Sequence, residues 1–117
     1  MSLNIHEREE KGVWVLELDG RVTLGEGSGQ LRNKLKECLS QGKTRLVLDL
    51  SEVAYIDSAG LGTLVAGFTS AQNQGASLKL AKLTNRFSEI LHITKLVTVF
   101  EVFPTVDEAV QSFASAS

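Results

Sequence analysis

The chain has 117 residues, of which 43% are hydrophobic and 22% are charged, and its formal net charge is −2 at pH 7. This length and composition suffice for the hydrophobic core of one ordinary globular domain, so we expect a single domain over residues 1–117. The cations are spread along the chain without a basic run, which gives no electrostatic support for binding nucleic acid.

Membrane insertion, disulfide bonding and metal binding find no support in the sequence either. The longest apolar runs, such as LVLDL, are far shorter than a membrane-spanning helix, and the amino end shows no basic segment followed by an apolar stretch. The single cysteine, Cys38, lies among leucines at helical spacing, which predicts a buried thiol. His6 and His92 belong to no ligand pattern. We expect a cytoplasmic protein without a metal or any other cofactor.

Two strands and a helix are predicted in the first part of the chain. The strands cover 3–9 and 12–20, with a turn near Gly12. In the second strand, one face carries Trp14, Leu16 and Leu18, and the other carries Val13, Val15 and Glu17. After a glycine-rich loop, leucines at helical spacing predict a helix over 27–40, which Gly42 ends.

The middle of the chain predicts strand, helix and strand. RLVLDL at 45–50 is apolar at nearly every position, as is typical of a central strand covered on both faces. A second helix follows, ends near Gly75 and buries Leu61, Leu64, Val65 and Phe68. The segment at 76–82 alternates and indicates another strand.

The last part of the chain predicts a helix, a short strand and a final helix. The third helix covers 85–92, with Thr84 as its cap. A short strand is expected within 97–102. The final helix lies within 104–113, where Thr105 and Glu108 have capping-box spacing, and its buried stripe is Val106, Ala109, Val110 and Phe113.

Alternating strands and helices of this kind predict an α/β fold. We expect a mostly parallel sheet of four to five strands, with an antiparallel strand at the amino end and about four flanking helices. Loops at the carboxyl ends of parallel strands gather on one edge, where ligands or partners usually bind. The loops after Leu18, Leu50 and Ala81 should meet there. They would bring together Arg21, Thr23, Ser28, Ser58 and Thr84.

The run YIDSAGLGTLVAGF, which starts the second helix, contains the most unusual local pattern. Asp57 or Ser58 can cap the helix. The cap does not explain Gly60 and Gly62, because each glycine inside a helix costs about 1 kcal/mol relative to alanine. Two explanations are open. The glycines pack closely on the strand beneath, or they leave a bare first turn through which a partner reaches the Ser58 hydroxyl.

Two catalytic or nucleotide-binding motifs are only half present. In GEGSGQ, Gln30 stands where the dinucleotide fingerprint requires its third glycine, and the loop itself contains no Gly-Lys-Ser or Gly-Lys-Thr of a P-loop, so a flexible loop is favoured. The nucleophile elbow of hydrolases needs glycine two residues before and two after its serine, but Ile56 precedes Ser58. His6 or His92 would have to serve as the base. A hydrolase therefore remains an alternative with little support.

The runs LVLDLSEVAYIDSAGLGTLVAG, LELDG and VFEVFPTVDEAV together resemble a STAS domain of the bacterial anti-sigma-factor antagonists, over residues 3–113. The resemblance implies a mixed sheet flanked by helices and a non-enzymatic switch controlled by phosphorylation. It implies that Ser58 is phosphorylated by a serine kinase of the histidine-kinase-like ATPase class that is also the anti-sigma factor. The unphosphorylated form would bind this partner and free the sigma factor, and a separate phosphatase would reset the switch.

The surface that binds the partner is expected around the helix that carries the serine. The expected partner-binding residues are Arg21, Thr23, Gly25, Ser28, Asp57, Ser58, Ala59, Gly60, Gly62 and Thr63. Many members of the family carry acidic residues where this chain has Arg21 and Thr23, so its surface is more positive and Arg21 could approach a phosphate on Ser58. Lys95 stands where a glycine is frequent in the family. A second hypothesis within the family is an adaptor domain of a membrane transporter or a larger signalling assembly, without the switch.

Overall fold

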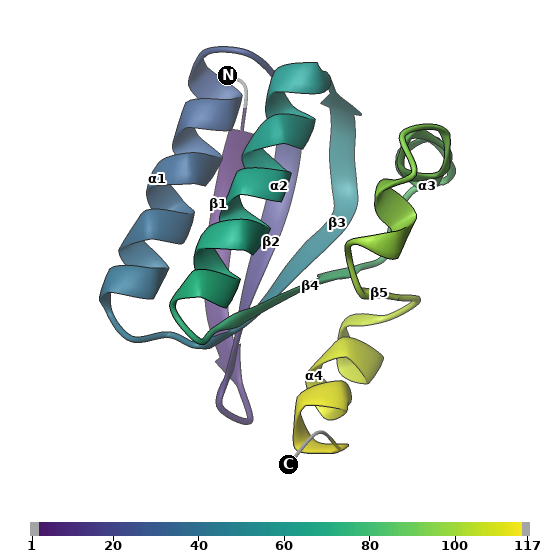
Figure 1. Cartoon of the computed structure of the whole chain (residues 1–117). Coiled ribbons are helices and arrows are strands. Elements are labelled where there is room, and N and C mark those ends of the chain that lie inside the picture. Colours follow the sequence, from purple (N-terminus) through teal and green to yellow (C-terminus); the bar gives the residue numbers. More distant parts are fainter. Residues whose placement is uncertain (1–2, 116–117) are drawn as a thin grey trace.

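A five-stranded sheet forms the centre of the computed structural model, which describes residues 3–115 (Figure 1). The strands are β1 (Leu3–Glu10), β2 (Val13–Val22), β3 (Arg45–Ile56), β4 (Ser77–Ala81) and β5 (Val102–Phe103), and they lie side by side in chain order. β1 pairs antiparallel with β2, and the remaining neighbours pair in parallel. The prediction of a mixed, mostly parallel α/β sheet with an antiparallel first strand is confirmed.

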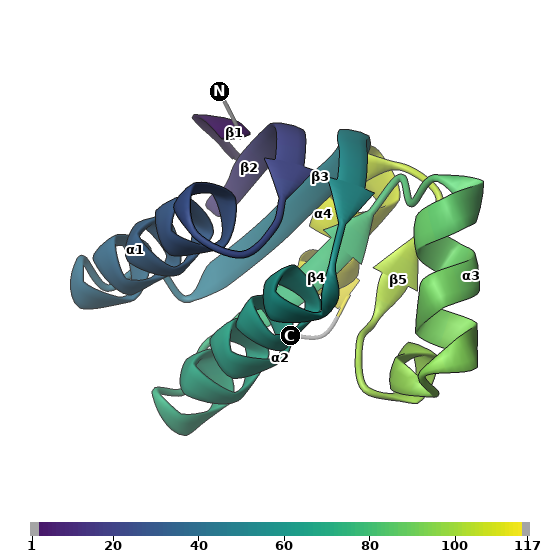
Figure 2. The ribbon, with the colours of Figure 1, turned by 90° about the horizontal axis from the view of Figure 1, so that it is seen from above.

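Helices cover both faces of this sheet. They are α1 (Glu26–Ser40), α2 (Ser58–Asn73), α3 (Asn85–Ile93) and α4 (Val106–Ser115). On β2, Leu16 and Leu18 face the core beneath α1, α2 and α3, whereas Val13 and Val15 face α4, as the alternation predicts. Figure 2 shows α1 and α2 side by side on one face and α4 behind the sheet. Cys38 is buried in the larger core.

The end of β3 differs from the prediction. RLVLDL was expected to end at Leu50, but the strand continues to Ile56, and β2 likewise runs past Leu18 to Val22. Two register shifts between β2 and β3 keep the strands paired over this stretch. At the first of these shifts, Asp49 Oδ1 accepts hydrogen bonds from both the amide and the hydroxyl of Ser51. The loops therefore start further along the chain than expected.

The predicted strand over 97–102 is wrong for most of its length. A 3-10 helix occupies Leu96–Thr98, and only Val102 and Phe103 pair with β4. A run of branched residues is ambiguous over such a short span, because a turn of helix can bury it equally well. None of the helices between residues 3 and 115 combines the length and the apolar character that crossing a membrane requires.

The predicted capping residues of the last two helices are confirmed. The amide of Phe87 donates to Thr84 Oγ1 at 3.2 Å at the start of α3. At α4, the amide of Glu108 donates to Thr105 Oγ1 at 3.1 Å, and the threonine hydroxyl donates to Glu108 Oε2 at 3.2 Å. The second bond joins the two side chains and differs from the usual box, in which the acid accepts from the cap's backbone amide.

Lys95 adopts a left-handed conformation with φ of 63°, which costs a residue with a side chain about 1 to 2 kcal/mol. We expect Lys95→Gly to raise the free energy of unfolding by about 1 kcal/mol, after the entropic cost of glycine is subtracted. Urea denaturation measures this change. Lys95→Ala removes the same charge but keeps Cβ, and an equal gain in both variants would contradict the explanation.

Candidate functional site

The site forms where β2 and β3 end and the helices that follow them begin. A single residue, Asp57, separates β3 from α2, and a short loop at 23–25 separates β2 from α1. The backbone amide of Ser28 donates to the carbonyl of Thr23 at 2.9 Å, which closes this loop against the first turn of α1. Both helix starts therefore lie at the carboxyl edge of the sheet, as predicted (Figure 2).

Asp57 joins three segments at this edge. Its Oδ1 accepts the amide of Gly60 at 2.9 Å and so caps α2, while its Oδ2 accepts the amide of Leu24 at 2.9 Å from the loop after β2. Its own amide donates to the carbonyl of Val22 at 3.3 Å. The amides of Leu24 and Gly60 stabilise the charged carboxylate, and this lowers the pKa of Asp57. The loop and the helix start are thus held by one ionised side chain.

Ser58 is the first residue of α2, and it is exposed. Of the two residues that could cap the helix, Asp57 does so, and the Ser58 hydroxyl makes no hydrogen bond within the part of the chain that the structure describes. The early amides of a helix and the positive end of its dipole stabilise an anion at this position. The position therefore suits a hydroxyl that receives a phosphoryl group from another protein.

The two glycines of α2 have different roles. A Cβ at Gly60 would overlap the carbonyl oxygen of Val22 and lie 2.8 Å from its carbonyl carbon, so this glycine lets the helix start lie directly on the end of β2. Nothing lies within 4 Å of the place where a Cβ at Gly62 would be, and Gly62 is exposed. The explanation by close packing therefore applies to Gly60. Gly62 is not packed, and access of a partner to Ser58 past it stays a prediction.

The residues predicted to bind a partner lie at different depths around this edge. Arg21, Gly25, Ser58 and Gly62 are exposed; Thr23, Asp57 and Ala59 are half-buried; Ser28, Gly60 and Thr63 are buried. The buried residues shape the surface from below and present no side chain to a partner. Thr63, for example, is 5% exposed, and its hydroxyl donates to the carbonyl of Ala59 at 3.1 Å.

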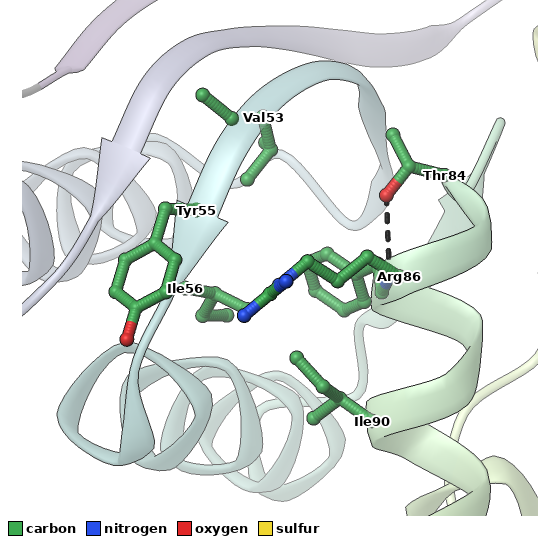
Figure 3. A pocket seen from close by; sticks show the side chains of 8 residues that line it. Val53, Tyr55, Ile56, Thr84, Arg86 and Ile90 are labelled. Carbon is green, nitrogen blue, oxygen red and sulfur yellow. Dashed lines mark hydrogen bonds between the residues drawn. The ribbon is translucent and has the colours of Figure 1, made fainter.

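Thr84 lies further along the same edge, in a small pocket between the end of β3 and α3 (Figure 3). The guanidinium of Arg86 lies 5.7 Å from the ring centroid of Tyr55 at this pocket, and both side chains are exposed. The Cα of Tyr55 is in turn paired with that of Arg21 across β2 and β3. At the carboxyl edge, Tyr55 therefore has Arg86 near its ring and Arg21 at the paired position of β2.

Leu24 was not among the residues predicted from the sequence. It is 79% exposed in the loop that Asp57 holds. The only signal in the sequence is a leucine inside a glycine-rich loop, and such a residue could equally have been a buried anchor. The structure places this apolar side chain beside the Asp57–Ser58 turn.

A metal site and a hydrolase active site are two other kinds of site that the sequence raised. Among residues 3–115, no group of three or more His, Cys, Asp or Glu side chains is arranged to hold a metal ion. His92 lies on α3, where its Nδ1 is 2.8 Å from the carbonyl oxygen of Ser88, and His6 lies on β1. Neither imidazole contacts Ser58 within the part of the chain that the structure describes, so the hydrolase hypothesis gains no support.

The chain belongs to the STAS domain family, whose sequence model matches residues 4–109. The anti-sigma-B factor antagonist of Bacillus subtilis is 30% identical over 111 residues, which cover 95% of this chain and 100% of the relative.

Solved structures share the fold. An anti-sigma factor antagonist from Mycobacterium paratuberculosis superposes with a TM-score of 0.82 at 22% sequence identity. The match covers 95% of this chain and 93% of the chain of that structure. The phosphorylated form of the Bacillus cell fate determinant SpoIIAA superposes with a TM-score of 0.72 at 16% sequence identity. This match covers 96% of this chain and 99% of the SpoIIAA chain.

The contrast between the two glycines can be measured directly. Gly60→Ala should lower the free energy of unfolding by about 3 kcal/mol, because backbone atoms of β2 would have to move. Gly62→Ala should raise it by about 0.5 to 1 kcal/mol, since alanine favours the helix and meets open space. Urea denaturation of both variants provides the measurement. A similar loss in each would show that Gly62 is also packed.

The ionised Asp57 predicts a pH dependence of stability. Because its pKa is lower in the folded state, its contribution is fully present above the ordinary value of 3.8 and is lost as the pH falls through the folded value. Asp57→Asn keeps an acceptor for Gly60 but not for Leu24, so it should be less stable than the parent at pH 7. The difference should shrink below pH 3.8.

Unfolding midpoints between pH 2 and 7 test this prediction. Asp19→Asn is the control, because Asp19 is exposed and its side chain makes no hydrogen bond among residues 3–115. A difference between parent and Asp57→Asn that stays constant down to pH 2 would exclude the ionised carboxylate as the cause.

Proposed function

We propose that this protein is an anti-sigma-factor antagonist whose binding is switched by phosphorylation of Ser58. The observation that carries the proposal is an exposed serine hydroxyl, without a hydrogen-bond partner among the described residues, at the first position of α2 beside a capping aspartate. The name of the Bacillus subtilis relative, whose whole length matches, supports the same function. We further propose that residues 1–117 act as a single domain in the cytoplasm and have no catalytic activity.

The chemistry of a phosphate at this position agrees with a switch that acts by blocking contact. A phosphoserine carries about −1.5 to −2 charges at neutral pH. The helix start tolerates this charge locally, so the domain need not refold. In the centre of an interface, the same charge beside Asp57 would add repulsion and a desolvation cost. The unphosphorylated protein therefore binds its partner, and the phosphorylated protein does not.

The partner in this proposal is a serine kinase of the histidine-kinase-like ATPase class that also acts as the anti-sigma factor. It approaches the carboxyl edge, where Ser58, Gly62 and Leu24 are exposed. Gly62 leaves the first turn bare, so that the kinase active site can reach the hydroxyl. A separate phosphatase returns the protein to its binding form.

Phosphorylation of Ser58 is the first test. Kinases of this class encoded in the same genome are incubated with the protein and ATP, and the modified residue is located by mass spectrometry. One of them should phosphorylate Ser58 and leave Ser58→Ala unmodified. An intact Ser58 under conditions where these kinases phosphorylate other substrates would refute the switch and favour the adaptor hypothesis.

Binding to that kinase, measured by calorimetry without ATP, tests the role of charge. Ser58→Ala should bind as the parent does, and Ser58→Asp should bind at least about tenfold more weakly, which corresponds to about 1.4 kcal/mol. Ser77→Asp is the control, because it adds the same charge at an exposed position at the amino end of β4. Equal affinities of Ser58→Asp and the parent would show that charge is not the switch.

A further inference from the structure

A groove lies between α1 and α2. Figure 1 shows that these two helices lie side by side over the same face of the sheet. Leu35, Leu39, Ala66 and Gly67 provide its apolar lining, and Arg32 and Lys36 stand one helical turn apart along its α1 side. Its volume is about 110 Å³. Gly67 gives the Leu35 side chain its room, since a Cβ there would lie 2.5 Å from Cδ1 of Leu35 and that side chain would have to shift.

The surface of α2 leads from Ser58 to this groove without interruption. No charged residue occurs in the whole of α2, from Ser58 to Asn73. Small exposed residues recur every four positions along it, at Ser58, Gly62, Ala66 and Ser70, and the last two border the groove. A partner that contacts Ser58 can therefore extend along α2 without meeting a charge or a large side chain.

The cations of the groove are available to a partner. Arg32 and Lys36 are exposed and form no ion pair with any residue from 3 to 115. Lys34, on the same helix, differs: Glu7 holds it at 2.7 Å and Glu37 at 2.8 Å, and these carboxylates raise its pKa. The groove thus combines an apolar floor with positive charge that nothing in the described chain neutralises.

We infer that the groove is a second anchor point for the anti-sigma-factor partner. It takes one apolar side chain of an acidic segment, whose carboxylates pair with Arg32 and Lys36. The size supports a side chain over a free ligand, because ligand sites usually measure about 300 to 1,000 Å³ whereas a cavity of about 150 Å³ holds one benzene. This inference rests on the proposed function and adds a specificity site to it.

Filling the groove tests the apolar contact. Ala66→Phe places a ring in the groove and should weaken binding to the kinase that phosphorylates Ser58 at least about tenfold. Gln72→Phe adds the same ring at an exposed position of α2 outside the groove and should leave the affinity unchanged. Circular dichroism checks that both variants are folded.

Charge reversal tests the pairing with carboxylates. The double variant Arg32→Glu and Lys36→Glu should bind at least about tenfold more weakly and should lose much of the salt dependence of the parent. The control double variant Lys11→Glu and Arg45→Glu makes the same change in net charge at exposed positions outside the groove, at the amino edge of the sheet. It should change the affinity little.

The outcomes separate this inference from the proposed function. If Ser58→Asp weakens binding while Ala66→Phe and the Arg32/Lys36 variant bind as the parent does, the groove is not an anchor and the switch stands. If the two control variants weaken binding as much as the groove variants, the effect is not specific to the groove and the inference is wrong. If no kinase of this class binds the parent, the proposed function and the inference both fail.

Discussion

The close contact of two helix starts with the end of β2 determines the geometry of the whole functional edge. Gly60 of α2 lies against the carbonyl of Val22, and Gly27 of α1 lies against the carbonyl of Arg21, so a Cβ at either glycine would overlap a backbone oxygen. Backbone atoms in a paired strand have little freedom to move aside. The relative positions of α1 and α2 are thereby fixed, and so is the groove between them.

Asp57 adds an electrostatic link to this steric one. By accepting amides from both Gly60 and Leu24, it ties the loop after β2 to the start of α2, and the exposed Leu24 is presented at a defined position. A surface that is held in this way can be blocked by a local charge without a change of fold. The proposed switch needs chemistry at one hydroxyl and no moving element in this protein.

The sequence predicted the fold well because its apolar periodicities are clear, and it predicted the site only in outline. The alternation in β2 and the stripe of α4 follow directly from the core they enter. The continuation of β3 to Ile56 depends on pairing with β2, which no local pattern encodes. For the same reason, the sequence could indicate that Gly60 and Gly62 were unusual but not how they differ. Only the position of α2 on the end of β2 shows that Gly60 is packed against the backbone and that Gly62 is open.

Distance along α2 separates the switch from the proposed anchor. Ala66 follows Ser58 by eight residues, which is about 12 Å along a helix, and the Debye length at physiological salt is about 8 Å. A phosphate on Ser58 is therefore largely screened from carboxylates held by Arg32 and Lys36. It must act on the contact at Ser58 itself, while the groove contributes affinity that does not depend on phosphorylation. In this arrangement the groove determines which partner binds, and phosphorylation of Ser58 determines when that partner is released.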